Sequence, residues 1–174
     1  LNSTLAGIEE AIECGFSLIK LNVVVLRKVN DHEIVNLADY GIERNCQVRF
    51  LELMPIGVTE KKFQDWFVPS KEVENKLIQK YTLKEISGGV SSSSRNFFAQ
   101  DNHGRKGIIG FISPYTAPFC DGCRRLRLTA EGKLIGCLAL NNKYEIRSLL
   151  ESEYSNDTSL LMGIINTSLN NKRR

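Results

Sequence analysis

The chain has 174 residues, which is enough for one domain or a domain and a half. Hydrophobic residues make up 42% of it and charged residues 25%, the composition of an ordinary soluble globular protein. A net charge of +3 is too small to indicate a nucleic-acid partner or a membrane surface, and no apolar run approaches the length of a membrane span. We therefore expect neither nucleic-acid nor membrane binding.

The sequence begins without an initiator methionine or a signal-peptide pattern and enters a helical pattern at once. We therefore expect a piece of a longer protein. Five cysteines, three of them clustered, suit metal binding in a reducing compartment better than a disulfide framework. This pattern predicts a cytoplasmic location.

The first third of the sequence predicts alternating helices and strands. In chain order the predicted elements are a helix capped by Ser3 and ending near Gly15, a buried parallel strand over residues 16–26, a helix beginning at Asn30 and Asp31, and a strand over residues 46–54. Cys14 is expected to be a small buried residue at the end of the first helix. This order is typical of a parallel sheet or a barrel.

The composition changes after Gly57, and the predicted elements become more varied. They are a loop over residues 59–68, a helix from Pro69 and Ser70 through Tyr81, strands over residues 83–86, 95–100 and 107–112, and helices over residues 145–153 and 158–169. We expect the strands at residues 95–100 and 107–112 to join a later hairpin in a small antiparallel sheet. The basic tail at residues 170–174 is expected to fray.

Two basic residues, Lys20 and Arg49, lie inside the apolar strands of the first third. A charge within a buried strand is costly unless it is paired or solvated. In a barrel, inward-pointing side chains near the C-terminal ends of the strands face the active site. The alternative is that both charges reach solvent at strand ends or pair with Glu52, and the pattern alone does not decide between the two.

Cys120, Cys123 and Cys137 follow the spacing C-x2-C-x13-C, the most informative motif of the chain. The first two lie on either side of an Asp-Gly turn, so both sulfurs can reach one metal. Residues 124–129 alternate apolar and basic side chains as a strand does, and residues 133–137 run back toward the first pair. Three thiolates at the base of a hairpin predict a metal site. Tetrahedral zinc would need a fourth ligand, whereas a cubic iron–sulfur cluster on three cysteines keeps one iron open.

The turn between the two strands decides which side chains share the face of Cys137. A two-residue turn at Glu131 and Gly132 pairs Leu126 with Cys137, whereas a three-residue loop with a left-handed Gly132 pairs Arg125 with Cys137. The segment Ala-Glu-Gly favours the three-residue loop, because the last position of that loop prefers glycine. The predicted hairpin therefore places thiolates and guanidinium groups on one surface.

The segment that carries this motif resembles the C-terminal cluster motif of the GTP 3′,8-cyclases, the molybdenum-cofactor biosynthesis protein A family. The resembling segments are FCDGCRRLRLTAEGKLIGCL and, upstream of it, IGFISPYTAPFC, KLNVVVLRKVND and VRFLELMPIG. The family's radical-SAM C-x3-C-x2-C motif and its C-terminal Gly-Gly tail are both absent from these 174 residues. The resemblance therefore implies the C-terminal half of such a protein.

The fold implied by this resemblance is α/β. Residues 1–58 would supply the C-terminal βα units of an incomplete TIM-type (β/α)6 radical-SAM barrel. Residues 59–174 would form a small α+β domain with an antiparallel sheet and a three-cysteine cluster site, which also binds GTP. The boundary between the two domains would then lie between residues 58 and 59.

The resemblance also implies iron–sulfur cofactors. Cys120, Cys123 and Cys137 would hold a second [4Fe–4S] cluster, whose open iron binds the base of GTP. The whole enzyme would carry a first [4Fe–4S] cluster that cleaves S-adenosylmethionine, and Met54 would contact that S-adenosylmethionine. These roles come from the family and not from the spacing of the residues.

GTP is the substrate that the resemblance implies, and the product is (8S)-3′,8-cyclo-7,8-dihydroguanosine 5′-triphosphate. Lys20 and Arg49 would contact the triphosphate, and Arg125 and Arg127 would hold further polar groups of GTP, as suits guanidinium and ammonium groups. The family often forms homodimers. It acts before cyclic pyranopterin monophosphate synthase in molybdenum-cofactor (molybdopterin) biosynthesis.

Two other functions stay open. Another radical-SAM enzyme with an auxiliary cluster, such as a peptide-modifying one, would usually carry more auxiliary cysteines than three. A structural zinc module that binds nucleic acid would need a fourth ligand and a broad basic face, and the sequence offers neither. As a radical-SAM protein, these 174 residues alone are expected to be inactive, because they lack the cysteines that reduce S-adenosylmethionine.

Overall fold

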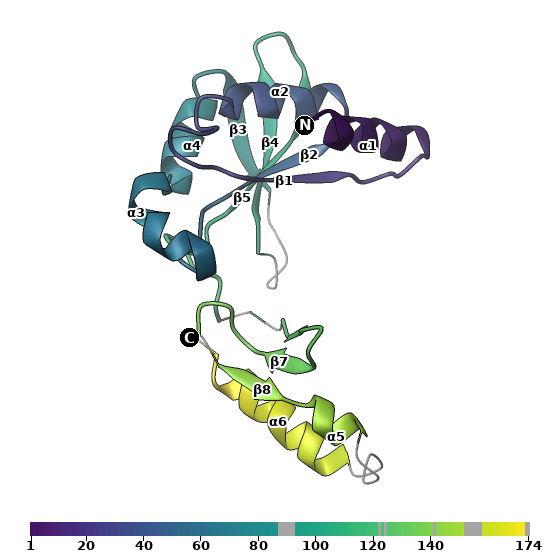
Figure 1. Cartoon of the computed structure of the whole chain (residues 1–174). Helices are drawn as coiled ribbons and strands as arrows, with labels where there is room; N and C mark the ends of the chain where they lie inside the picture. Colours follow the sequence, from purple (N-terminus) through teal and green to yellow (C-terminus); the bar gives the residue numbers. More distant parts are fainter. Residues whose placement is uncertain (87–92, 122, 124, 141, 152–157, 173–174) are drawn as a thin grey trace. The chain divides into compact units, whose positions relative to one another are not determined.

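The structure is a computed structural model that describes residues 1–86, 93–121, 123, 125–140, 142–151 and 158–172 (Figure 1). It contains two compact units. The first comprises residues 1–54 and 61–118, and the second comprises residues 55–60 and 119–174. The domain boundary at residues 58 and 59 stays a prediction. None of the described helices is both long and apolar enough to cross a membrane.

The helices and strands follow the predicted order. The helices are α1 (Asn2–Glu13), α2 (Ile34–Glu43), the 3-10 helix η1 (Gly57–Lys62), α3 (Phe63–Trp66), α4 (Ser70–Leu77), α5 (Arg147–Glu151) and α6 (Thr158–Asn170). The strands are β1 (Lys20–Val24), β2 (Gln47–Leu51), β3 (Tyr81–Ile86), β4 (Arg95–Asp101), β5 (Lys106–Ile112), β6 (Arg127–Leu128), β7 (Lys133–Ile135) and β8 (Lys143–Glu145). The α-β-α-β order of the first third and the two closing helices are confirmed, although residues 152–153 of the predicted helix lie outside the described residues.

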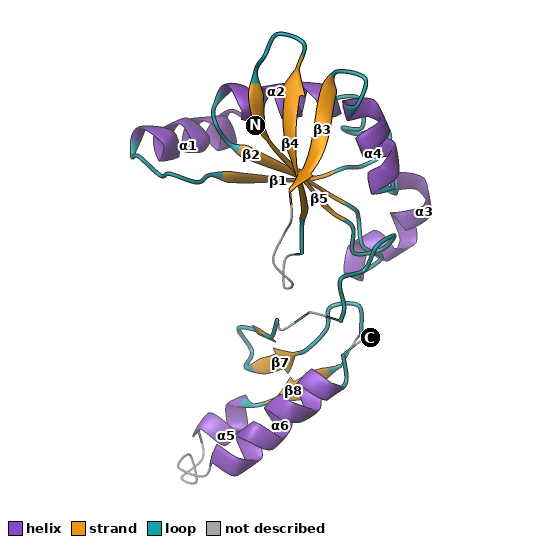
Figure 2. Cartoon of the chain, turned by 180° about the vertical axis from the view of Figure 1, so that it is seen from behind, coloured by secondary structure: helices purple, strands orange, loops and turns teal. Residues whose placement is uncertain are grey.

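The first unit is built on a mixed five-stranded sheet in the order β1-β2-β5-β4-β3 (Figures 1 and 2). Strands β1, β2 and β5 are parallel, β4 is antiparallel to β5, and β3 is antiparallel to β4. The predicted turn between β4 and β5 is closed by a bond from the Gly104 amide to the Asp101 carbonyl. The expectation that β4 and β5 join the later hairpin is wrong, because β5 pairs with β2 and so extends the first sheet.

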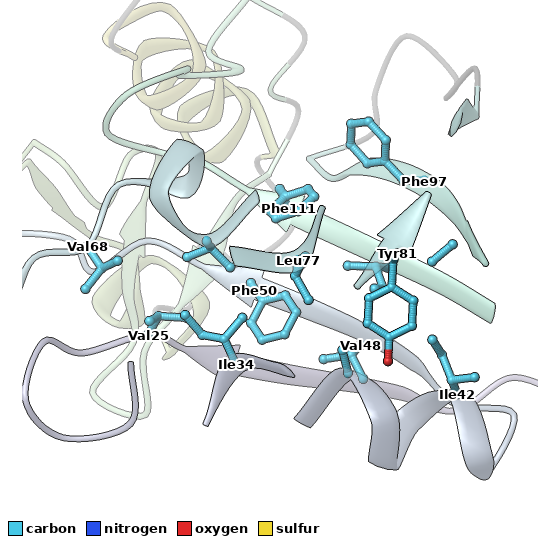
Figure 3. Close-up of a cluster of buried hydrophobic side chains, with 14 residues drawn as sticks. Val25, Ile34, Ile42, Val48, Phe50, Val68, Leu77, Tyr81, Phe97 and Phe111 are labelled. Carbon is cyan, nitrogen blue, oxygen red and sulfur yellow. The ribbon is translucent and has the colours of Figure 1, made fainter. Parts of the chain in front are cut away.

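One face of this sheet forms the hydrophobic core with α2 and α4. Val48, Phe50 and Phe111 contribute from the strands, and Ile34 and Leu77 contribute from the two helices, each at most 1% exposed. Figure 3 shows these side chains together, with the Phe50 and Phe111 ring centroids 6.4 Å apart. Alternate residues of each strand and one stripe of each helix are buried on this face, which explains why apolar side chains occupy it.

The opposite face of the sheet carries the polar residues of β1 and β2. Because strand side chains alternate between faces, Lys20, Asn22 and Arg49 lie on the face opposite Val48. Alternate residues of β1 are exposed, including Val24 at 41%. The expectation of a strand buried on both faces is therefore wrong for β1, which lies at the edge of the sheet and is covered on one face.

The first helix differs from the prediction in its N-cap and in the burial of Cys14. It begins at Asn2, with Leu1 as N-cap and no side-chain cap, so Ser3 does not cap it. Cys14 lies at the C-cap and is exposed rather than buried, because no residue of α1 is buried. Gly15 follows in the left-handed region at φ 78°, which ends the helix where the sequence predicts.

Two further boundaries are corrected. Helix α2 begins at Ile34, because the Asn30 and Asp31 side chains accept bonds from backbone amides in the preceding turn. The helix expected through Tyr81 ends at Leu77, and Tyr81 begins β3. The segment at residues 59–68 is not a plain loop, since most of η1 and all of α3 lie within it.

The second unit holds a three-stranded antiparallel sheet in the order β6-β7-β8, together with α5 and α6. The backbone of Gly136, just after β7, approaches α6 closely. A Cβ built at Gly136 would lie 2.2 Å from the carbonyl oxygen of Ser168, so a side chain there would push the two elements apart. The α+β character expected for the end of the chain is therefore present, as a sheet separate from the first one.

A charged network lies on the first unit, where Arg105 forms ion pairs with Asp39, Asp101 and the more exposed Glu43. The guanidinium contacts Asp39 at 3.0 Å and Asp101 at 2.7 Å. Burial alone would raise the pKa of the Asp39 carboxyl, but hydrogen bonds from Lys80 and Tyr81 outweigh it and lower that pKa. Burial acts in the same direction on Asp101, but the Arg105 side chain and nearby backbone amides lower the pKa of Asp101.

Replacing Arg105 with glutamine is expected to lower the free energy of unfolding at neutral pH. The free energy of unfolding of this variant should also change less as the pH falls into the acid range. With folded-state pKa values below their usual range, Asp39 and Asp101 stabilise the protein above the unfolded-state pKa of about 3.9 and lose this effect as the pH falls through the folded values. The difference from wild type should be largest near pH 7 and shrink toward about pH 2. Urea titrations across this range measure it, with Arg95→Gln, whose arginine is 52% exposed, as the control. A difference that stays constant with pH would contradict the prediction.

Candidate functional site

Lys20 of β1 and Arg49 of β2 lie on the polar face of the first sheet, although they are not direct partners in the strand pairing. Arg49 is aligned with Asn22, and Lys20 is aligned with Gln47, two positions earlier on β2. Lys20 is exposed, whereas Arg49 is partly buried. Glu52 accepts bonds from backbone amides, so the alternative that it balances these two charges is not supported.

Arg49 packs across Gly110 toward a polar corner of the same face. A Cβ at Gly110 would lie 3.1 Å from Cγ of Arg49 and 2.6 Å from Oγ of Ser94, so a side chain there would displace its neighbours. Asn96 is held in this corner by Gln47, whose Nε2 donates to Asn96 Oδ1 at 2.8 Å. Within the described part of the chain, Nε of Arg49 is buried without a hydrogen-bond partner. A buried donor of this kind favours a polar or anionic ligand, which would satisfy it.

A buried carboxylate lies just beyond the end of β2. Glu52 is 4% exposed and accepts bonds from the backbone amides of Ser70 at 2.8 Å, Tyr115 at 3.1 Å and Thr116 at 2.9 Å. The hydroxyl of Thr116 donates to the same carboxylate. Glu52 thus fixes the start of α4 and the segment after β5 against the end of β2. Met54, the candidate S-adenosylmethionine contact, follows two residues later and is partly buried.

The first two cysteines of the motif lie in one tight turn, in which the amide of Cys123 donates to the carbonyl of Cys120 at 3.0 Å. Cys120, Cys123 and Cys137 are all partly exposed. Burial would raise the pKa of the Cys123 thiol, but the backbone amide and guanidinium of Arg125, together with Lys172, lower it. A lowered pKa favours the thiolate, which is the form that binds metals.

The hairpin that follows adopts the predicted three-residue loop. Gly132 is left-handed at φ 79°, its amide donates to Thr129 at 3.0 Å, and the Thr129 amide donates to Lys133 at 2.9 Å. In the same register, Arg127 of β6 pairs with Ile135 of β7, and Leu128 pairs with Leu134. Continued along the strands, this register aligns Arg125 with Cys137, so the prediction for the turn is confirmed.

The two candidate arginines are placed by different contacts. The guanidinium carbon of Arg125 lies 4.8 Å from the centroid of the Phe119 ring, in a cation–π contact beside Cys120. Arg127 lies in β6, is partly buried and pairs with Ile135. Arg125 therefore contacts the segment that leads into Cys120, whereas Arg127 belongs to strand β6.

The chemistry of the three thiols fits an iron–sulfur cluster, since thiolates are the ligands that such clusters use. Among the described residues, no group of three cysteine, histidine, aspartate or glutamate side chains lies close enough to hold a metal ion. The structure therefore brings Cys120 and Cys123 into one turn and places Cys137 two residues after β7, but it does not assemble the complete site. The three-cysteine site stays a prediction.

Sequence reasoning missed Lys172, which it assigned to a frayed tail. Helix α6 extends to Asn170, and Nζ of Lys172 donates to the carbonyl oxygens of Cys123 at 3.0 Å and Arg125 at 2.8 Å. The prediction of fraying is therefore wrong for residues 170–172, while residues 173–174 lie outside the described residues. No pattern in the sequence marks this lysine, because its contacts depend on how α6 lies against the hairpin.

Comparison with known proteins gives consistent matches. A family model described as Molybdenum Cofactor Synthesis C matches residues 46–174. A GTP 3′,8-cyclase of Saccharophagus degradans is 37% identical over 153 residues, which cover 87% of this chain and 45% of the relative. GTP 3′,8-cyclases of Pseudomonas savastanoi pv. phaseolicola and Synechocystis sp. are each 36% identical, covering 95% and 94% of this chain and 49% of each relative. The chain thus spans about half the length of the curated relatives it matches.

Proposed function

Because the chain belongs to the Molybdenum Cofactor Synthesis C family, we propose that it is the GTP-binding half of a GTP 3′,8-cyclase in molybdenum-cofactor biosynthesis. The observation that carries this proposal is the hairpin register, in which Arg127 pairs with Ile135, so that its continuation would bring Arg125 opposite Cys137, just after the turn of Cys120 and Cys123. That arrangement combines a cluster motif with cationic groups for a nucleotide. Three relatives named GTP 3′,8-cyclase support it.

Cys120, Cys123 and Cys137 are the residues proposed to hold a second [4Fe–4S] cluster. When bound, such a cluster would supply one iron without a protein ligand, as an acceptor for the base of GTP. The lowered pKa of the Cys123 thiol favours the thiolate that ligation needs. The protein's share at this site is to hold the three sulfurs and to exclude other ligands.

The phosphates of GTP are proposed to bind Lys20 and Arg49. The buried Nε of Arg49 offers a donor that is already desolvated and oriented, whereas Lys20 supplies a mobile charge beside it. Arg125 and Arg127 are proposed to hold other polar groups of the nucleotide. Binding of this kind orients GTP for the radical reaction, and the protein contributes positioning and electrostatic stabilisation.

The polar face of β1 and β2 is proposed to belong to a radical-SAM barrel of the (β/α)6 type, completed by the other half of the protein. Two basic residues on one face of the sheet support this proposal, although Lys20 begins β1 and Arg49 lies in the middle of β2, rather than at the C-terminal strand ends that the sequence suggested. In the complete enzyme Met54 would contact S-adenosylmethionine, which a first [4Fe–4S] cluster would cleave. We further propose a cytoplasmic homodimer that acts before cyclic pyranopterin monophosphate synthase.

Anaerobic reconstitution of the complete protein with iron and sulfide is expected to yield about four irons for the second cluster, the content of a cubic cluster. A variant in which the cysteines of the first cluster are replaced isolates this signal. Adding Cys123→Ala to that variant should remove the remaining iron, because the thiolate ligand is lost. Cys14→Ala, which replaces an exposed cysteine of α1, is the matched control and should bind as much iron as its parent.

The same experiment separates the proposal from its two rivals. Stoichiometric zinc without iron uptake would favour a structural zinc module and contradict the proposal. Iron uptake without any change in the cluster spectrum on adding GTP would favour another radical-SAM enzyme with an auxiliary cluster. An electron paramagnetic resonance signal that shifts with GTP is the result expected for the proposed function.

A further inference from the structure

The last turn of α6 and the residues after it contact both segments that carry the motif cysteines. One contact lies next to Cys137, where Gly136 approaches the helix. A Cβ at Gly136 would lie 2.2 Å from the backbone oxygen and 2.7 Å from Oγ of Ser168. Because one of these atoms belongs to the backbone, the approach leaves no room for a side chain. Ser168 itself is 1% exposed, and within the described residues its Oγ has no hydrogen-bond partner.

The other contact lies at the first cysteine pair. The ammonium group of Lys172 donates to the carbonyl oxygen of Cys123 at 3.0 Å and to that of Arg125 at 2.8 Å. It also lies 4.0 Å from Sγ of Cys123. One side chain thus joins two carbonyl oxygens on either side of residue 124, and it does so from the far end of the sequence. Such charge-assisted bonds are stronger than those between neutral groups.

The hairpin by itself does not fix all three sulfurs. Its described strand pairs end at Arg127 and Ile135, so Cys123 and Cys137 both lie beyond the paired residues. A cluster needs its ligands held to within a fraction of an ångström, which requires a support outside the ligands themselves. The end of α6 reaches the backbone at both places where the strand pairing has stopped.

We propose that the segment from Ser168 to Lys172 positions the two cysteine segments for the cluster, with Lys172 and the Gly136–Ser168 contact as its two fixed points. The inference rests on the proposed function, because it assumes that the three cysteines hold a cluster. Lys172 and Ser168 act here as positioning residues and do not touch the substrate. Loss of either fixed point leaves one cysteine segment free to move away from the other.

The test follows iron bound to the second cluster in the complete protein that lacks the first-cluster cysteines. After anaerobic reconstitution, a chelator is added and the rate of iron loss is measured for this parent protein (called wild type below) and for its Lys172→Met and Gly136→Ala variants. Groups that orient metal ligands typically change metal affinity by about 10- to 100-fold, so we expect both variants to lose iron at least about ten times faster. Lys143→Met removes an exposed lysine of the same unit and should leave the rate unchanged.

Two further measurements keep this test decisive. Lys172→Arg keeps a charged donor at the same position and should retain iron longer than Lys172→Met. The electron paramagnetic resonance spectrum of the reduced cluster should broaden in Lys172→Met, whereas a general loss of stability would lower iron content without changing the line shape. If wild type takes up no iron, the proposed function is wrong. If wild type holds its cluster and Lys172→Met and Gly136→Ala lose iron at the wild-type rate, the positioning role is overturned.

Discussion

Replacing Glu52 with alanine is expected to lower the free energy of unfolding by at least about 3 kcal/mol, because it removes the acceptor of four hydrogen bonds in a buried position. Hydrogen bonds to a charged group contribute about 1.5–3 kcal/mol each, although the four do not add independently. The donors are backbone amides of Ser70, Tyr115 and Thr116 and the hydroxyl of Thr116. Without the carboxylate these donors lose the acceptor that satisfies them in a buried position.

A milder change at the same position separates charge from shape. Glu52→Gln keeps the volume but presents an amide NH2 group to donors, so we expect about half the loss seen with alanine. Urea unfolding of the apo protein measures both variants, with Glu85→Gln, which replaces an exposed residue of β3, as the matched control. Surface changes of that kind usually stay within about 0.5 kcal/mol. A Glu52→Gln protein as stable as the control would show that this carboxylate is not needed.

A double-mutant cycle identifies which contact matters. Thr116→Val removes one donor to Glu52 while keeping the size of the side chain. If the two residues act through their shared bond, the loss from Glu52→Gln plus Thr116→Val should be smaller than the sum of the single losses. The cycle bears on function as well, since Thr116 lies four positions before Cys120 in the sequence. A fixed Thr116 anchors the start of the chain segment that leads to the cysteines.

Residue patterns predicted the structure well where local chemistry decided the outcome. The parallel pairing of β1 with β2 followed from the predicted α-β-α-β order. The left-handed Gly132 and its three-residue loop were predictable because that turn position prefers glycine. In each case a few neighbouring residues determine the conformation.

The prediction was wrong where a distant element decided the outcome. Strand β5 joined β2 rather than the later hairpin, because Ile109 and Phe111 complete the core on β2, and nothing near them in the sequence indicates that partner. Cys14 is exposed because α1 buries none of its residues, although a free cysteine usually behaves as a small buried hydrophobic residue. Contacts between remote segments are not visible in a local pattern.

In the candidate site, too, some features could be predicted from the sequence and others could not. The spacing of the cysteines and the charges within apolar strands were visible in the sequence, and the structure places Lys20 and Arg49 on one face. The supporting contacts of Glu52 and Lys172 were not visible, because each joins segments far apart in the chain. Ligand residues stand out by their type, whereas the groups that hold them in place are recognised only in three dimensions.

Replacing Arg49 with alanine in the complete protein is expected to weaken GTP binding by one to two decades while leaving guanosine binding much less affected. A charge-assisted contact to a phosphate is worth roughly 1.5–3 kcal/mol, and about 1.4 kcal/mol corresponds to tenfold in affinity. The effect of Arg49→Ala should lie at the upper end of this range, because its Nε is buried and already desolvated. Lys20→Ala should lie at the lower end, because Lys20 is exposed and its charge is screened by solvent.

Anaerobic equilibrium binding of GTP and of guanosine to the reconstituted protein measures this difference directly. Lys71→Ala is the matched control for Lys20, since it removes an exposed lysine of α4, which packs on the opposite face of the same sheet. The ratio of GTP to guanosine affinity should fall in both site variants and stay at the wild-type value in the control. Equal losses for nucleotide and nucleoside would mean that Lys20 and Arg49 do not contact the phosphates. A loss confined to Arg49→Ala would restrict phosphate binding to the polar corner formed by Arg49, Gly110 and Asn96, because only Arg49 of the two basic residues packs there.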